Sequence, residues 1–462
     1  MSKKKNLLPV KLGEKIIVEI ESLTSGGEGI GRYKGLAVFV ADTAPGDKAE
    51  VKITELRKNY ARAKVMYLQE RSRSRIEPEC PVFYKCGGCQ WQHLPYEVQL
   101  QEKTRMVRDN IERIGGINPD LVLDTIGSER PFYYRNKVQF PVREKDGRMI
   151  MGFYAPGTHD VVEVDSCVIQ NKAGDVLAFQ AKDILAEEGI SVYDESTGRG
   201  FLRHIMVRQA KKTGELMLVL IANGGKLPKE EKIIARLVKA ASPKLVSICL
   251  NVNREKGNVI MGRLTKLLWG KGTITDYIGS LAFHISAQSF YQVNSLQTEV
   301  LYNKVLEYAA LTGEETVIDA YCGIGTISLL LAQQAKKVYG IEVVSRAIED
   351  AKHNAELNGI SNVEFRVGKS EVIMPELSEK GVRPEVIVID PPRKGCERIV
   401  LETMADMKPD RIVYVSCNPS SLARDLACLA ELGYEAELIQ PVDMFSQTAH
   451  VECVVLLTKA HK

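Results

Sequence analysis

The sequence lacks the long apolar runs that mark membrane proteins. A membrane-spanning helix needs about 18 apolar residues in a row, and the longest runs here, over residues 329–332 and 454–457, are far shorter. Lysines at positions 3–5 make the start of the chain basic, but no apolar signal-peptide core follows them. We therefore expect a cytoplasmic protein with no membrane partner.

The composition also lacks the biases of fibrous, disordered and disulfide-rich proteins. Of 462 residues, 45% are hydrophobic and 26% are charged, and the chain contains no internal repeat or low-complexity tract. A chain of this length has room for about two to four globular domains.

Excess charge is missing overall, because 62 basic residues face 59 acidic ones. This balance hides an asymmetry between two parts of the chain. Residues 1–75 hold 16 basic and 9 acidic residues, a net charge of +7, while the remainder carries −4. A basic segment of this kind indicates contact with a polyanion such as nucleic acid, although a solubilising charged tail would have the same composition.

Residues 9–70 predict a small β-barrel. Apolar and polar residues alternate over 10–20 and 49–53, and glycine-containing turns lie at 26–29 and 45–47. Several short strands with such turns favour a barrel of the OB kind, a fold that often binds oligonucleotides.

The same region places cations beside an aromatic ring. Lys58 and Arg62 flank Tyr60, so the cations could neutralise phosphates while the ring stacks on a base. A small interaction barrel with a solvated face is the alternative interpretation.

A helix and a strand-rich region follow the barrel. Residues 96–114 carry apolar side chains at helical spacing, begin after Pro95 and end at Gly115. Short apolar stretches then predict strands at 137–142, 149–154, 205–209, 216–221 and 246–252. From about residue 317, apolar strands alternate with helices, which is typical of a parallel α/β sheet.

Three basic residues of the strand-rich region are candidates for an RNA-binding groove. Arg135 and Lys137 fall on one face of a predicted strand, and Arg203 lies near another. Surface charge on a sheet is an equally good interpretation.

A glycine-containing loop follows the first strand of the C-terminal sheet. Residues 316–321 form a buried strand, residues 322–326 include two glycines, and Glu342 lies at the tip of the next strand, 17 residues after Gly325. Such a loop lets a ligand approach the backbone at a helix N-terminus, and the acid suits a ribose diol. With Asp319 in the first strand and Ser328 in place of a third glycine, the pattern resembles S-adenosylmethionine (SAM) methyltransferases more than dehydrogenases.

Two further strand ends carry reactive side chains. Residues 385–389 end in Asp390 and a Pro-Pro pair; amino-methyltransferases have an aromatic residue after such a pair, whereas Arg393 stands here and argues against N-methylation. Residues 411–415 lead into Cys417, which is followed by Asn-Pro. Ligands bind at the carboxyl ends of parallel strands, so this cysteine is a candidate nucleophile. The alternative is a small buried hydrophobic residue.

The ten cysteines are unevenly spread. Cys80, Cys86 and Cys89 fall within ten residues, in a C-x5-C-x2-C pattern. In a reducing compartment such a cluster indicates a metal site or a catalytic site rather than disulfides. The pattern differs from the C-x3-C-x2-C of radical-SAM enzymes.

The motifs together resemble the bacterial RNA uracil-C5-methyltransferase family, in its branch that methylates 23S ribosomal RNA and carries a TRAM domain and an iron–sulfur cluster. The resemblance covers nearly the whole chain. It rests on Cys80, Cys86, Cys89 and Cys167, Phe290-Tyr291-Gln292-Val293-Asn294, the loop over 319–325, Asp390-Pro391-Pro392-Arg393, Ser416-Cys417-Asn418-Pro419 and His450-Val451-Glu452.

The resemblance implies a two-residue mechanism. C5 of uracil is a poor nucleophile, but a thiolate that adds to C6 creates an enolate whose C5 can take a methyl group from SAM. A base then removes the C5 proton and the thiol leaves. By resemblance, Cys417 is the nucleophile and Glu452 the base. From the residues alone, Glu452 would instead be a surface carboxylate at the start of an edge strand, 451–457.

The resemblance also implies the SAM contacts. Tyr321 would flank the cofactor and Glu342 would take the ribose hydroxyls. Asp390 and Gln292 would lie where SAM and the uracil edge meet. Thr326 stands where some relatives have an Asn, so that contact is not expected.

For the cysteines, the resemblance implies a structural [4Fe–4S] cluster held by Cys80, Cys86, Cys89 and Cys167. Four thiolates would serve a tetrahedral zinc equally well, and a chance grouping is the remaining alternative.

We therefore predict an α/β fold in three modules: a TRAM barrel (1–70), a central β-rich iron–sulfur domain (71–94 and 123–285), and a Rossmann-like SAM-dependent methyltransferase domain (95–122 and 286–462). The expected partner is folded ribosomal RNA with a flipped-out uridine. The expected oligomeric state is a monomer.

Three other functions stay open. One is methylation of uracil C5 in tRNA. Another is methylation of cytosine C5 in RNA, although those enzymes usually have a further Pro-Cys after the acid and none follows Asp390. The last is a non-catalytic iron–sulfur RNA-binding assembly factor.

Overall fold

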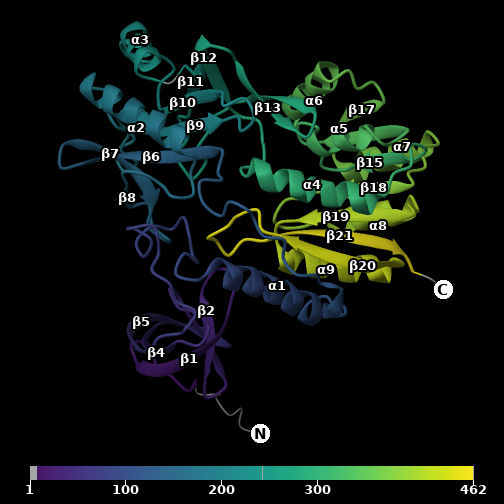
Figure 1. Ribbon diagram of the computed structural model, residues 1–462, viewed down its shortest axis with the longest axis horizontal. Helices are drawn as coiled ribbons and strands as arrows, with labels where there is room; N and C mark the ends of the chain where they lie inside the picture. Colours follow the sequence, from purple (N-terminus) through teal and green to yellow (C-terminus); the bar gives the residue numbers. More distant parts are fainter. Residues whose placement is uncertain (1–7, 242, 461–462) are drawn as a thin grey trace.

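The computed structural model describes residues 8–241 and 243–460. The basic start at positions 3–5 and the first seven residues of the predicted barrel module lie outside the described residues. Figure 1 shows a small barrel near the N-terminus, a sheet formed by the middle of the chain and a second large sheet that ends near the C-terminus.

Five strands close into the N-terminal barrel, in the order β1-β2-β3-β5-β4, which confirms the predicted barrel. The core is apolar because alternate side chains point inward, such as Ile16, Val18 and Ile20. The first strand begins later than position 10, because residues 11–14 form a turn with Gly13 at a φ of +79°. The strands are β1 (Lys15–Leu23), β2 (Gly29–Tyr33), β3 (Leu36–Val40), β4 (Lys48–Leu56) and β5 (Tyr60–Glu70).

The predicted helix over 96–114 is confirmed as α1 (Tyr96–Arg113). It follows a turn-rich segment, residues 71–95, and packs on α9 (Pro419–Glu431) near the end of the chain. Its apolar face, which includes Val107 and Ile111, joins the core of the C-terminal sheet. A short 3-10 helix, η1 (Pro119–Leu121), comes next.

The middle of the chain forms a seven-stranded sheet in the order β12-β11-β10-β9-β6-β7-β8, with a separate β13-β14 hairpin. The side chain predicted for an RNA groove at Arg203 is instead 3% exposed, and its guanidinium donates to the backbone oxygens of Asn253 and Glu255. The prediction of an RNA contact by Arg203 is wrong, because its guanidinium is buried and bound to backbone oxygens. The elements are β6 (Lys137–Lys145), β7 (Arg148–Tyr154), β8 (Val161–Glu163), α2 (Lys172–Glu187), β9 (Leu202–Gln209), β10 (Leu216–Ala222), α3 (Glu230–Ala240), β11 (Leu245–Val252), β12 (Leu264–Gly270), β13 (Thr273–Ile278) and β14 (Leu281–Ser286).

The C-terminal sheet has the order β17-β16-β15-β18-β19-β21-β20. Its first five strands are parallel, and β21 is antiparallel to β19. The strand over 451–457 is not an edge strand, because β20 pairs with its outer side. The elements are α4 (Ser295–Ala309), β15 (Thr316–Asp319), α5 (Thr326–Ala332), β16 (Lys337–Glu342), α6 (Ser345–Leu357), β17 (Val363–Val367), α7 (Ser370–Glu379), β18 (Val386–Ile389), α8 (Arg398–Asp406), β19 (Arg411–Ser416), β20 (Tyr434–Val442) and β21 (Glu452–Lys459).

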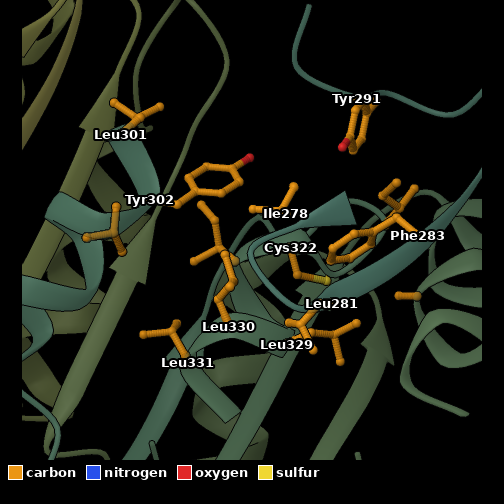
Figure 2. Close-up of a cluster of buried hydrophobic side chains, with 14 of the residues drawn as sticks. Ile278, Leu281, Phe283, Tyr291, Leu301, Tyr302, Cys322, Leu329, Leu330 and Leu331 are labelled. Carbon is orange, nitrogen blue, oxygen red and sulfur yellow. The ribbon is translucent and has the colours of Figure 1, made fainter. Parts of the chain in front are cut away.

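Apolar layers cover both faces of this sheet. Figure 2 shows part of one layer, where Tyr302 of α4 lies near the α5 leucines and Phe283 of β14 lies beside Cys322. The hydroxyls of Tyr302 and Thr326 share a hydrogen bond of 3.2 Å. The layer therefore fixes the start of α5, directly after the glycine loop.

Among the residues that the structure describes, no helix is both long and apolar enough to cross a membrane.

Candidate active site

The carboxyl ends of the parallel strands bring four predicted site residues to one edge of the C-terminal sheet. Tyr321 follows β15 and Glu342 ends β16, while Asp390 follows β18 and Cys417 follows β19. Open α/β sheets bind their ligands at this edge.

The first cavity at this edge has a volume of about 220 Å³ and is lined by Tyr321 and Glu342. The backbone N–H of Val344 donates to the Glu342 carboxylate (2.9 Å), which orients it. Lys369 and Ser370 also line the cavity. They follow β17, whose sequence carries none of the motifs described above.

The glycine loop beside this cavity needs its glycines. Gly325 has a φ of +84°, and a Cβ there would lie 3.0 Å from the Phe365 ring. Ser328, which replaces a third glycine, donates to Oδ2 of Asp319 (2.6 Å). Oδ1 of Asp319 is buried and has no partner among the described residues, and burial raises the pKa of this carboxyl to about 6. The oriented Glu342 carboxylate in the cavity fits a ligand with a ribose diol, such as SAM.

A second cavity, of about 160 Å³, lies against Cys417. Arg393 and His450 line it, and so does Ser25 of the barrel. Ser416 and Cys453 form the last pair between the antiparallel strands β19 and β21, and Cys417 and Glu452 are the next residues beyond that pair. Cys417 was expected from the strand pattern and Glu452 from the family resemblance, whereas no pattern in the sequence indicated Ser25.

Burial and neighbouring acids suppress ionisation at this second cavity. Glu452 is 4% exposed, and burial together with Asp390 raises its pKa well above the ordinary value, against the opposing effect of Arg393. Burial, Glu452 and Asp390 raise the pKa of the Cys417 thiol to about 11. Burial and Asp319 raise the pKa of Asp390 to about 7. The two carboxyls are therefore shifted toward neutral pH, where they can exchange protons, whereas the Cys417 thiol is held in its protonated form.

The loop that leads into Glu452, residues 443–451, is held by α1. Lys103 and Asp443 form a fully buried ion pair of 2.5 Å, and the Tyr96 hydroxyl donates to the same carboxylate (2.6 Å). The Gln99 side chain donates to Gln447 (2.9 Å). Figure 1 shows this loop, in yellow, reaching the dark-blue segment that precedes α1. These contacts fix the approach to Glu452.

Gln292 lies before α4 and is 8% exposed. The side-chain amide of Asn136 donates to its backbone oxygen (2.9 Å). Gln292 lines neither of the two cavities described above, so its predicted contact with SAM stays a prediction.

Cys80, Cys86, Cys89 and Cys167 line a third cavity of about 210 Å³, together with Arg135 and Lys137. Arg135 and Lys137, which were candidates for an RNA-binding groove, therefore line the cysteine cavity. Burial raises the pKa of the Cys89 and Cys167 thiols to about 12. Within the described part of the chain, no three His, Cys, Asp or Glu side chains lie close enough to hold a single metal ion.

Two protein-family models match this chain, one near each end. A family model described as tRNA (Uracil-5-)-methyltransferase matches residues 274–460, and a TRAM domain model matches residues 9–66. A Bacillus cereus protein named an uncharacterized RNA methyltransferase is 50% identical over 454 residues, which cover 98% of each chain. A Halalkalibacterium halodurans protein of the same description is 51% identical over 453 residues, or 98% of this chain and 99% of that one.

A solved structure agrees with these relatives. The crystal structure of Pyrococcus abyssi tRNA (uracil-54, C5)-methyltransferase in complex with S-adenosyl-L-homocysteine is 30% identical, with a TM-score of 0.77 over 96% of this chain and 99% of that chain. The chain therefore belongs to the family of SAM-dependent RNA (uracil-5-)methyltransferases and is an enzyme with an N-terminal TRAM domain.

Proposed function

We propose that this enzyme methylates C5 of a uridine in 23S ribosomal RNA, with Cys417 as nucleophile and Glu452 as base. The observation that carries the proposal is their position: both residues lie one position beyond the last pair between β19 and β21, and the Cys417 cavity lies at the same edge of the sheet as the Glu342 cavity. The base is proposed to be flipped out of folded RNA, because C6 cannot reach a thiol while stacked in a helix.

In the proposed reaction, the Cys417 thiol loses its proton to solvent and the thiolate sulfur bonds to C6 of the uracil, while the C5=C6 electron pair moves toward the C4 carbonyl to form an enolate. The enolate C5 then takes the methyl group of SAM and leaves S-adenosylhomocysteine. Glu452 accepts the proton from C5, the C6–S bond breaks, and the C5=C6 double bond reforms. A carboxylate with a raised pKa is a stronger base than an exposed one, which suits this last step.

For SAM itself, we propose contacts from Tyr321, Glu342, Asp390 and Gln292. Glu342→Gln is expected to weaken SAM binding about 10- to 100-fold, because one charge-assisted set of hydrogen bonds to the ribose is lost. Isothermal titration with SAM measures the effect. Glu356→Gln, an exposed acid on α6, serves as the control and should bind SAM normally. Equal SAM affinity in the two variants would contradict the assignment of Glu342.

We also propose a structural [4Fe–4S] cluster at the four cysteines. All four line one cavity, which suits a cluster that sits between its ligands. Four thiolates would serve a tetrahedral zinc ion equally well, and the choice of iron–sulfur rests on the family resemblance. The cluster would join the segment that contains Cys80, Cys86 and Cys89 to Cys167.

Anaerobically purified protein is then expected to be brown, with about four irons per chain. Cys167→Ser should lose the iron and melt at a lower temperature, because one thiolate ligand is missing. Cys428→Ser, at a half-buried cysteine of α9, should keep both. Metal analysis and thermal melting test this, and a colourless protein that retains zinc would refute the iron assignment.

The choice of ribosomal RNA rests on the family resemblance. The family model and the Pyrococcus abyssi structure both carry tRNA in their names, so tRNA is the second candidate substrate. Mapping 5-methyluridine in ribosomal RNA and tRNA from a strain lacking the gene separates them: loss in 23S ribosomal RNA supports the proposal, and loss only in tRNA overturns it.

The proposed organisation is a cytoplasmic monomer of three modules: residues 1–70, residues 71–94 with 123–285, and residues 95–122 with 286–462. The closed barrel and the two sheets support this division. The ten cysteines, all within the described residues, form no disulfide bonds, which suits a reducing compartment.

A further inference from the structure

The barrel contributes a side chain to the cavity that holds Cys417. Ser25 lies in the turn between β1 and β2, and it lines this cavity together with Arg393 and His450. Ser25 is exposed, so it stands at the mouth of the cavity rather than at its floor. A nucleotide that enters toward Cys417 must therefore pass this turn.

The turn is held rigidly in its position. The backbone N–H of Thr24 donates to the oxygen of Glu28 (2.9 Å), and that of Gly27 donates to the oxygen of Thr24 (2.8 Å). The indole N–H of Trp91 donates to the oxygen of Gly27 (3.4 Å). Gly27 has a φ of +86°, and a Cβ there would lie 2.6 Å from Gln90, so the turn is packed directly against the segment that follows Cys89.

Gln90 also holds the opposite wall of the cavity. Its backbone N–H donates to the oxygen of Gln447 (3.1 Å), and its side-chain oxygen accepts from the N–H of Ala449 (3.4 Å). Ala449 lines the same cavity as Ser25. The barrel turn and the loop before Glu452 are therefore fixed to one residue, so the width of the opening between them is set by the fold.

We propose that the barrel turn is part of the substrate site, with Ser25 binding the ribose–phosphate backbone of the target nucleotide at the mouth of the Cys417 cavity. The uracil ring must lie inward, against Cys417, so its sugar and phosphate face outward to Ser25. Arg393, which lines the same cavity, supplies a positive charge for the phosphate. The barrel thus contacts the target nucleotide itself at the reaction centre. This inference rests on the proposed function of Cys417.

The test compares Ser25→Asp and Ser25→Ala with Ser361→Asp. The control serine is exposed and lies just before β17, at the opposite edge of the sheet from the cavities. Ser25→Asp places a negative charge against the phosphate and is expected to raise the KM for RNA about tenfold or more, and Ser25→Ala about threefold, with SAM affinity and melting temperature unchanged. Ser361→Asp should match the wild type.

A KM for RNA within twofold of wild type in Ser25→Asp would overturn the inference, and so would an equal rise in Ser361→Asp. Covalent capture of 5-fluorouridine-containing RNA by the wild-type enzyme is measured in parallel. Capture by the wild type with normal KM in Ser25→Asp refutes only the role of Ser25. Absence of capture refutes the proposed function of Cys417 and this inference with it.

Discussion

Cys417→Ala is expected to abolish 5-methyluridine formation, with kcat falling at least about 10⁴-fold, a loss typical of removing a covalent nucleophile. Without sulfur addition at C6, no enolate forms and C5 stays unreactive toward the methyl group. SAM affinity should not change, because Cys417 does not line the cavity that contains Glu342. The measurement is transfer of labelled methyl groups to RNA, followed by nucleoside analysis.

A covalent trap makes the role of Cys417 directly visible. Wild-type enzyme incubated with SAM and 5-fluorouridine-containing RNA should remain attached to the RNA in a denaturing gel, because fluorine at C5 cannot be removed as a proton. Cys417→Ala should give no such band. Cys428→Ala, which changes a half-buried cysteine of α9, should behave like the wild type. Methylation of C5 by Cys417→Ala would show that the mechanism is wrong.

Those site residues that follow strand ends could be predicted from the sequence. Buried strands of the C-terminal sheet are short apolar runs, and the residue after each run falls at the carboxyl edge of the sheet. Glu342, Asp390 and Cys417 all occupy this position, and the structure brings them to one edge. The signal is local, since the strand and its terminal residue are adjacent in the chain.

Contacts between distant segments could not be predicted in this way. Lys103 and Asp443 form a buried ion pair across 340 positions, and Ser25 joins a cavity with Cys417, nearly 400 positions later. Nothing in the sequence around any of these residues differs from an ordinary helix or turn. Only the packing of α1 and the barrel against the C-terminal sheet gives them a role.

Glu452 illustrates both situations. The residues around it predict a carboxylate at the start of an edge strand, which would be solvated. The structure adds β20 outside β21 and covers the carboxyl, so the same residue becomes buried and its pKa rises. The role of Glu452 as the base comes from the family resemblance and stays a prediction, whereas the local pattern alone pointed to a solvated carboxylate.

Glu452→Gln is expected to lower kcat about 10²- to 10⁴-fold, the range for loss of a general base. Thiol addition and methyl transfer do not need this carboxylate, whereas removal of the C5 proton does. The variant should therefore accumulate a methylated covalent adduct between Cys417 and unmodified RNA. Mass spectrometry detects it as protein plus RNA plus one methyl group. Glu435→Gln, at an exposed acid of β20, should turn over normally.

Titration of Glu452 should make the rate of elimination depend on pH, and Glu452→Gln should remove this dependence. Because burial and Asp390 raise the pKa of Glu452, its basic form still increases at pH values well above the ordinary carboxyl range, so elimination by the wild type should accelerate as pH rises through that higher range. The adduct of Glu452→Gln should decay slowly and without that rise. A decay rate in the variant that matched the wild type would exclude Glu452 as the base.

Glu452→Gln should lower activity but should not lower the stability of the fold. Above the unfolded-state pKa of 4.5, the native state holds the Glu452 proton more tightly than the unfolded chain does, so the contribution of this group to folding falls as pH rises. Glutamine carries no titrating proton and escapes this loss. Glu452→Gln should therefore melt at the same temperature as the wild type or higher, with the difference larger at pH 8 than at pH 5. A lower melting temperature at pH 8 would mean that the carboxylate stabilises the fold, and its activity loss could then not be assigned to proton transfer.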